Sequence, residues 1–214
     1  MKEKGLHPKN NFKNGYNFDE LIIKNPELKQ FVAKNEFGTV TIDFSNPEAV
    51  RELNKALICS LDKISNWNFP KENLCPPIPG RLDYIHYLAD LISFNGEAKI
   101  LDIGTGATCI YPLLGASVFD WSFVATDIDL DSLDVAQDII DDNNLTEKIE
   151  LRQQFKEENI LIDDLAYNFL KSNSGVFHLI NGSSNNHNNS NISKSIKVKE
   201  FAKYIPMNTS LVVQ

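Results

Sequence analysis

Residues 98–108, AKILDIGTGAT, decide the fold of this chain. The first six form a short apolar run that is typical of a buried strand, and Gly104 and Gly106 follow it as a tight turn. The sequence from this turn to Gly115 has a helical pattern. A buried strand that enters a glycine turn and then a helix predicts the first unit of a parallel α/β sheet.

Further strands alternate with helices beyond this turn. Residues 121–125, 149–151 and 176–180 are predicted strands, and helical patterns at 130–140 and 161–170 separate them. Such alternation predicts a doubly wound α/β sheet, of Rossmann-like architecture.

The pattern stops after residue 180. Six of the residues in 181–191 are Asn, and a stretch of this composition predicts a flexible linker. Only 200–204 and 210–213 have structured patterns beyond it, so we expect a sheet that lacks its last strands.

Helical elements are predicted before the sheet. Residues 18–33 suggest two short helical turns, and 39–44 alternate with the period of a strand. Asn46-Pro47 predicts a capped helix start, and a second amphipathic helix is expected at 81–92. We therefore divide the chain into an N-terminal extension at 1–95, a Rossmann-like core at 96–180 and an Asn-rich tail at 181–214.

Charge is unevenly distributed along a chain whose net charge is −8. Residues 1–34 carry +3 and residues 171–214 carry +4, which leaves −15 on residues 35–170. Basic ends on an acidic body favour contact with nucleic-acid phosphates, although solvated termini would give the same pattern. Charge alone does not decide between these interpretations.

Composition indicates one domain with an appendage, because 42% of the 214 residues are hydrophobic. No apolar run approaches the ~20 residues that span a bilayer, and the N-terminus lacks the apolar centre of a secretory signal. The three Cys form no CxxC pair, which favours reduced thiols. We expect a monomer in the cytoplasm, or alternatively the nucleus, without a membrane partner and without a metal.

The glycine turn predicts a ligand at the carboxyl end of the first strand. A dinucleotide fingerprint needs a third glycine where this chain has Cys109, which disfavours NAD. Asp102, an acid before a GxG turn, suits the ammonium of S-adenosylmethionine instead. Asp127 lies 21 residues beyond Gly106, at a strand end where its carboxylate can accept both ribose hydroxyls. The glycines alone would also fit a structural turn, and Asp127 favours the cofactor.

Residues 102–113, DIGTGATCIYPL, resemble the signature of a family of RNA adenine-N6 methyltransferases. Bacterial members of that family methylate 23S ribosomal RNA, and eukaryotic relatives methylate a spliceosomal small nuclear RNA and hairpins in messenger RNA. The resemblance is continuous over about residues 5–155. Further matching blocks are GLHPKN at 5–10, NPELKQF at 25–31, DFSNPEAV at 43–50 and LCPPIPGRLDYIH at 74–86.

The resemblance implies a class I methyltransferase sheet, S-adenosylmethionine as cofactor and structured RNA as partner, with large-subunit ribosomal RNA favoured over small nuclear RNA. It implies that Gly104, Gly106 and Thr108 contact the cofactor, that Asp127 holds its ribose and that Arg81 meets its methionine carboxylate. Tyr84 and His86 are interpreted as packing residues. The residues that match the RNA-binding arm of relatives are His7, Lys9, Asn10, Lys13, Gly15, Tyr16, Asn17 and Phe18.

The chain departs from the family after about residue 175, and the difference is plain where the predicted strand at 176–180 ends. The family has Asn-Pro-Pro-Phe at this point, where the Asn and a Pro carbonyl accept the hydrogens of the adenine amine and the aromatic stacks on the flipped base. Here Asn181-Gly182-Ser183-Ser184 follows, so only Asn181 remains as a candidate catalytic residue. Without the platform for the base, we expect little or no methyl transfer.

Three explanations fit this departure. The chain is a truncated, frameshifted or mis-spliced form of the enzyme, a non-catalytic paralogue that binds RNA or cofactor, or an incompletely folded remnant with an exposed sheet edge.

Overall fold

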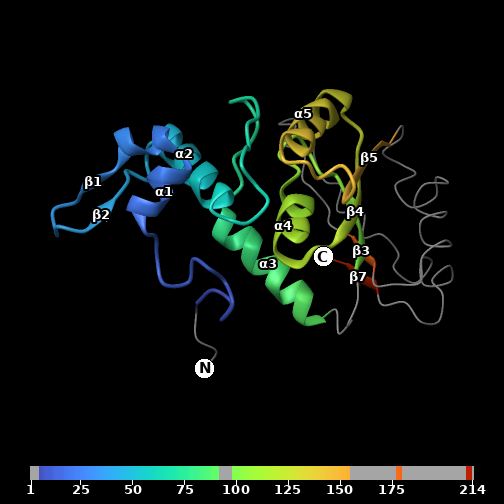
Figure 1. Cartoon of the computed structure of the whole chain (residues 1–214), viewed down its shortest axis with the longest axis horizontal. Coiled ribbons are helices and arrows are strands. Elements are labelled where there is room, and N and C mark those ends of the chain that lie inside the picture. The colour runs from blue at the N-terminus through green and yellow to red at the C-terminus, as the bar shows by residue number, and fades with distance from the viewer. Residues whose placement is uncertain (1–4, 92–97, 155–176, 180–210, 214) are drawn as a thin grey trace, which may run out of the picture.

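The structure is a computed structural model that describes residues 5–91, 98–154, 177–179 and 211–213. The N-terminal elements lie at one end and the parallel sheet at the other, with the long helix α3 (Ile78–Leu91) between them (Figure 1). In the part of the chain that the structure describes, no helix has the length and apolar character needed to cross a membrane.

Short elements form the N-terminal end: α1 (Phe18–Lys24), the 3-10 helix η1 (Pro26–Phe31), β1 (Ala33–Lys34) and β2 (Val40–Thr41). The strand predicted at 39–44 is wrong in its length, because only Val40–Thr41 pairs, antiparallel to β1. The reason lies in the next turn, where the Asp43 carboxylate accepts from the backbone N–H and the hydroxyl of Ser45, at 2.8 and 2.6 Å. Such local side-chain bonds compete with a strand ladder.

Helix α2 (Pro47–Cys59) begins as predicted, since the Asn46 side chain accepts from the backbone N–H groups of the first turn, Glu48 and Ala49. Helix α3 begins at Ile78, earlier than the predicted residue 81. The Ile78 N–H donates to the Asn54 side chain of α2 at 2.8 Å, which satisfies one of the unpaired donors at the start of α3. Because this contact joins two residues that are 24 positions apart, no local sequence pattern predicts it.

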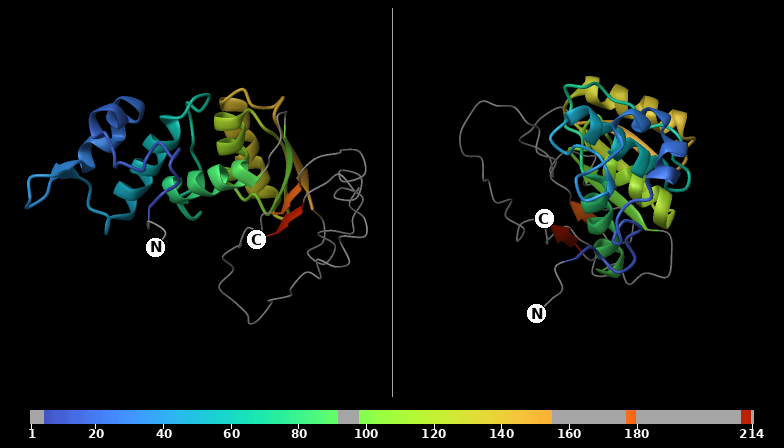
Figure 2. Two further views of the ribbon diagram at one scale, coloured as in Figure 1. Left: turned by 90° about the horizontal axis from the view of Figure 1, so that it is seen from below. Right: turned by 90° about the vertical axis from the view of Figure 1, so that its left-hand side faces the viewer.

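The core sheet contains β3 (Lys99–Ile103), β4 (Ser122–Asp127) and β5 (Ile149–Gln153), parallel and in the order β3-β4-β5. Strand β6 (Phe177–Leu179) lies beside β3 and pairs in parallel with β7 (Leu211–Val213). Figure 2 shows β6 and β7 beside the core strands. The predicted α/β class is therefore confirmed, while the helix predicted at 161–170 lies outside the described residues.

Helices α4 (Ile110–Phe119) and α5 (Leu130–Asp142) cover one face of this sheet, and α3 packs against α4 (Figures 1 and 2). One hydrophobic core runs through both ends of the molecule, and Leu28, Leu57, Ile85, Leu113 and Phe123 are buried in it. The boundaries predicted at 95/96 and 180/181 lie outside the described residues and stay predictions.

Candidate functional site

The loop after β3 is held in a tight conformation by the end of β4. Gly104 and Gly106 have φ angles of 78° and 63°, in the left-handed region that favours glycine. The N–H groups of Gly104 and Thr105 both donate to the Thr126 carbonyl, at 2.7 and 3.0 Å. A Cβ on Gly106 would meet no atom within 4 Å, so its glycine is required by the φ angle rather than by lack of space. The predicted helix after the turn starts at Ile110, because Cys109 before it still has a left-handed conformation.

Asp127 ends β4 beside this loop, as predicted. One carboxylate oxygen accepts from the Gly106 N–H at 2.8 Å, and the other accepts from the Asp129 N–H at 3.0 Å. These two bonds fix the carboxylate and tie it to the loop. Each oxygen retains a further lone pair, so the group can still accept from a ligand with two adjacent hydroxyls.

Asp102 lies in β3 directly before the loop and is 1% exposed. Neither of its carboxylate oxygens has a hydrogen-bond partner among the described residues. The Thr105 hydroxyl lies near enough to lower the pKa of Asp102 slightly, but it does not form a hydrogen bond to this carboxylate. Burial dominates and, with the nearby Asp127 carboxylate, raises the pKa of Asp102 to about 7. A buried acid without a partner beside a surface loop calls for a cationic group.

Arg81 reaches the same region from α3. Its Nη1 donates to the Tyr111 hydroxyl at 2.8 Å, and its Nε is buried without a partner within the described parts of the chain. Tyr111 lies in the first turn of α4. Burial raises the pKa of its phenol, and the Asp102 carboxylate adds to that shift, which places these groups near one another. The structure thus brings a guanidinium, a buried acid and the glycine loop together.

Thr108 and Cys109 complete the loop. Thr108 is half-buried, and its carbonyl accepts from the Trp67 indole N–H at 2.9 Å. Cys109 is fully buried and has a φ of 45°. Burial raises the pKa of its thiol far above the usual range, which keeps it in the unreactive protonated form.

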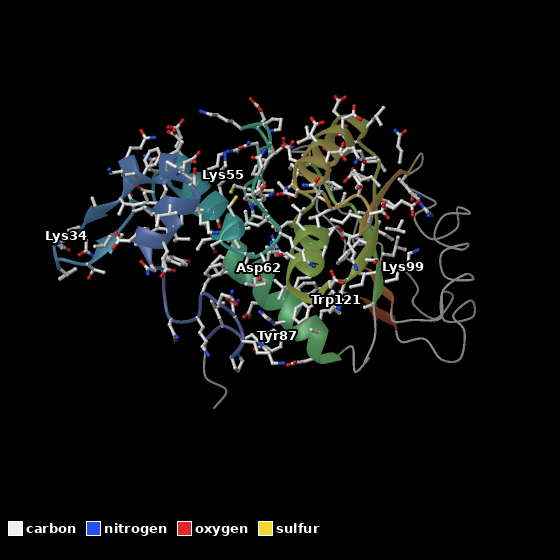
Figure 3. All side chains as sticks on the ribbon, in the orientation of Figure 1. Lys34, Lys55, Asp62, Tyr87, Lys99 and Trp121 are labelled. Carbon is white, nitrogen blue, oxygen red and sulfur yellow. The ribbon has the colours of Figure 1, made fainter. Side chains whose placement is uncertain are left out.

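The arm predicted to bind RNA is attached to α3 by inward-facing side chains. His7 is buried, bonds to Asp90 at 2.9 Å through Nε2 and stacks on His86, with ring centroids 5.2 Å apart. Asn10 is also buried and donates to the Pro79 carbonyl at 2.9 Å. Tyr87, which contacts the His7 ring edge to face, projects from α3 beside the arm (Figure 3).

The remaining arm residues are divided between packing and exposed positions. Phe18 is buried, Tyr16 is half-buried, and Asn17 caps α1. The exposed residues that could meet a large anion are Lys9 and Lys13, with Gly15 also at the surface. RNA contact by the eight arm residues stays a prediction, and the inward positions of His7 and Asn10 already have a structural role.

Two residues near the site have no place in the sequence prediction. Tyr111 holds Arg81 across a separation of 30 residues, which no local pattern reveals. Ile128, directly after Asp127, is 41% exposed and offers an apolar surface beside the carboxylate. The signal available in the sequence was an apolar residue placed directly after the acid that ends a predicted strand.

Two predictions, the catalytic residue and the absence of a metal, stay untested. Asn181, the candidate catalytic residue, lies outside the described residues. Among the residues that are described, no group of three or more His, Cys, Asp or Glu could hold a metal ion.

Comparison with known sequences relates the chain to RNA-modifying proteins. The model of a family described as RNA methyltransferase matches residues 1–195. The chain is 49% identical over 181 residues to ribosomal RNA large subunit methyltransferase F of Flavobacterium johnsoniae, covering 78% of this chain and 57% of the relative. It is 47% identical over 165 residues to the protein of the same name from Pseudomonas syringae, covering 73% and 50%. The chain therefore spans little more than half the length of these curated relatives.

Solved structures show the same likeness. A structure of the METTL16 MTase domain matches with a TM-score of 0.70 and 34% identity, over 83% of this chain and 70% of that one. The N-terminal domain of human METTL16 in complex with SAH matches with a TM-score of 0.71 and 30% identity, over 94% and 78%.

Proposed function

This chain belongs to the RNA methyltransferase family, and we propose that its described residues form the cofactor-binding half of an S-adenosylmethionine-dependent RNA adenine-N6 methyltransferase. One observation carries the proposal: Asp102, a buried acid that has no partner in the described part of the chain, and Asp127, a fixed acid, flank a glycine loop. The complex of the related human METTL16 domain with SAH supports it.

The residues present fit this cofactor. The ammonium of the cofactor can serve as the cationic partner of the buried Asp102 carboxylate. Ligand binding should therefore return the pKa of Asp102 toward its ordinary range. Asp127 has lone pairs left for the two ribose hydroxyls, and the Arg81 Nε, unpaired within the described segments, can donate to the carboxylate. Ile128 provides an apolar surface of the kind that an adenine ring covers.

The residues would act on the reaction by binding and orientation. When bound, S-adenosylmethionine supplies an electrophilic methyl on a sulfonium. Arg81 and Asp102 would fix the amino-acid end and Asp127 the ribose, which together set the direction in which the methyl faces. The glycine loop lets the backbone approach without a Cβ. Groups that accept the adenine amine protons belong to the region of Asn181, which we propose as a weak remnant of the motif.

RNA is the proposed partner, and large-subunit ribosomal RNA the proposed substrate class, because two relatives carry that substrate in their names. A METTL16 catalytic domain solved with an RNA hairpin supports the choice of a structured RNA. We place the contact on the arm at residues 7–18, where Lys9 and Lys13 are exposed. Replacing both by Ala should weaken binding of a ribosomal RNA fragment and flatten its salt dependence, by a slope of about 0.7–0.9 for each lost phosphate contact.

A binding role without methyl transfer is the second candidate. It is favoured by the sequence after Ile180, which has Gly-Ser-Ser where the family has Pro-Pro-Phe. Methyl transfer to ribosomal RNA at the rate of an intact relative would refute it.

Calorimetric titration with S-adenosylmethionine tests the cofactor site. We expect micromolar binding that is lost in Asp127→Ala and kept in Asp134→Ala, an exposed acid on α5 with the same change of charge. Circular dichroism of the three proteins serves as the control for folding. Absence of binding to the folded wild-type chain would refute the proposed function, as would equal loss in both variants.

A further inference from the structure

The guanidinium of Arg81 is held by a side chain of another helix. Arg81 lies in the first turn of α3, and its Nη1 donates to the hydroxyl of Tyr111, at the start of α4, over 2.8 Å. The centre of the guanidinium lies 5.6 Å from the centroid of the Tyr111 ring. One of the five N–H donors is thus used to anchor the group, and the buried Nε, which has no partner among the described residues, remains for a planar anion.

The Tyr111 ring is itself fixed from behind. It packs edge to face against Tyr84, with ring centroids 5.2 Å apart and an angle of 61° between the planes. Tyr84 lies one turn after Arg81 on the same helix, so α3 supplies both the guanidinium and the support of the ring that binds it. The phenol is therefore clamped between two side chains of α3.

Burial raises the pKa of Tyr111 more than the Arg81 cation lowers it. The phenol is consequently neutral at physiological pH, and it meets Arg81 as a hydrogen-bond acceptor rather than as a second charge. A neutral anchor does not itself neutralise the positive charge of Arg81, so Tyr111 does not compete with an anionic ligand for that charge. This separates the contact from an ion pair, which would compete with a carboxylate.

We propose that Tyr111 is the positioning residue for Arg81, which it holds in the orientation that receives the carboxylate of the cofactor. The inference rests on the proposed function and adds a specificity device to it. A long Arg side chain loses considerable rotamer freedom when it is fixed, and a preformed anchor removes part of that cost from ligand binding. The site should therefore favour ligands with the amino-acid end over those that contain only the nucleoside.

Two ligands separate this role from general support of the fold. S-adenosylhomocysteine has the carboxylate, whereas 5′-methylthioadenosine has the same nucleoside and sulfur without the amino-acid end. Tyr111→Phe removes the hydroxyl and keeps the ring that packs on Tyr84. In calorimetric titrations we expect this variant to lose about tenfold in affinity for S-adenosylhomocysteine and to keep its affinity for 5′-methylthioadenosine within about twofold.

A double variant tests that Tyr111 acts through Arg81. Arg81→Ala should weaken S-adenosylhomocysteine at least as much as Tyr111→Phe, and the combined variant should be no weaker than Arg81→Ala alone, because the hydroxyl then has no guanidinium to hold. Full additivity of the two losses would overturn the assignment. Equal loss of both ligands in Tyr111→Phe would also overturn it, since that result indicates a structural role.

The same titrations distinguish failure of the inference from failure of the proposed function. If the folded wild-type chain binds neither ligand, the cofactor site itself is refuted, and the assignment of Tyr111 with it. If the wild-type chain binds both ligands and Tyr111→Phe changes neither affinity, the site stands and only the positioning role is refuted.

Discussion

Replacing Asp102 by Asn should change the stability of the protein in a way that depends on pH. Burial, with a smaller contribution from the Asp127 carboxylate, raises the pKa of Asp102 from 3.8 to about 7. A difference of about 3 units at 1.36 kcal/mol each means that the ionised carboxylate destabilises the fold by about 4 kcal/mol. Asp102→Asn keeps the shape of the side chain and removes its titration.

The sign follows from where the proton is held. Between pH 4 and pH 7 the folded chain keeps the Asp102 proton while the unfolded chain releases it, so the folded state binds more protons. The contribution of this group to wild-type stability therefore falls as pH rises through that window and is constant above about pH 8. The amide has its own constant cost of burial, which cancels when the variant is compared with the wild type at different pH values.

Urea unfolding of both proteins at pH 4, 6 and 8 measures the effect. We expect the stability difference to move by about 4 kcal/mol in favour of the Asn variant from pH 4 to pH 8. At pH 8, saturating S-adenosylhomocysteine should stabilise the wild type more than the variant, since its ammonium pairs with the ionised acid. A stability difference that does not change with pH would refute the reasoning, because it would mean that the native protein already gives Asp102 a partner.

Three further changes test the packing of α4, the cap of α2 and a buried histidine of α3. Gly115→Ala would place a Cβ 2.4 Å from Phe123 Cζ, so it should destabilise the fold by about 1–3 kcal/mol in urea unfolding. The control Gly80→Ala, in open space on α3, should be neutral or should stabilise the fold by about 0.5 kcal/mol. Similar effects of the two substitutions would contradict the packing of Gly115 against Phe123. Asn46→Ala removes the cap of α2 and should lower the free energy of unfolding by about 1 kcal/mol in the same assay, with no change expected in cofactor affinity. Burial lowers the pKa of His86, and the nearby imidazole of His7 adds to the shift. As pH drops below about 6.5, the unfolded chain therefore binds a proton at this histidine before the folded chain does, and the free energy of unfolding should fall. His86→Phe should lose that part of the pH dependence, measured by urea unfolding between pH 7.5 and 5.5.

Local sequence was sufficient to predict the strand and the glycine turn that form the proposed cofactor loop. The apolar run that ends at Ile103 had the signature of a buried strand, and the positive φ angles of Gly104 and Gly106 are conformations that glycine adopts without strain. Asp127 was predicted from its distance along the chain, because parallel strands bring their carboxyl ends to one edge of the sheet. The observed bond from Gly106 to Asp127 has its origin in that topology.

Tertiary contacts limited the rest. The strand at 39–44 was predicted too long because its alternation continues past Thr41, while the side-chain bonds of Asp43 divert the chain. The start of α3 depends on Asn54, 24 residues earlier. The order of residues does not reveal that Asp102 has no partner among the described residues, or that Tyr111 reaches Arg81, since both depend on tertiary packing.

Helix α3 explains why the N-terminal arm and the cofactor loop belong to one structural unit. Asn10 of the arm donates to the Pro79 carbonyl at 2.9 Å and to the Asp83 carboxylate at 3.3 Å, which lie on either side of Arg81 in the same turn of α3. That turn is joined to α4 through Tyr111. The segment proposed to hold RNA is thus anchored where the side chain proposed to hold the cofactor is placed. A shift of one therefore requires a shift of the turn that positions the other, so the arm and the proposed cofactor site share one structural support.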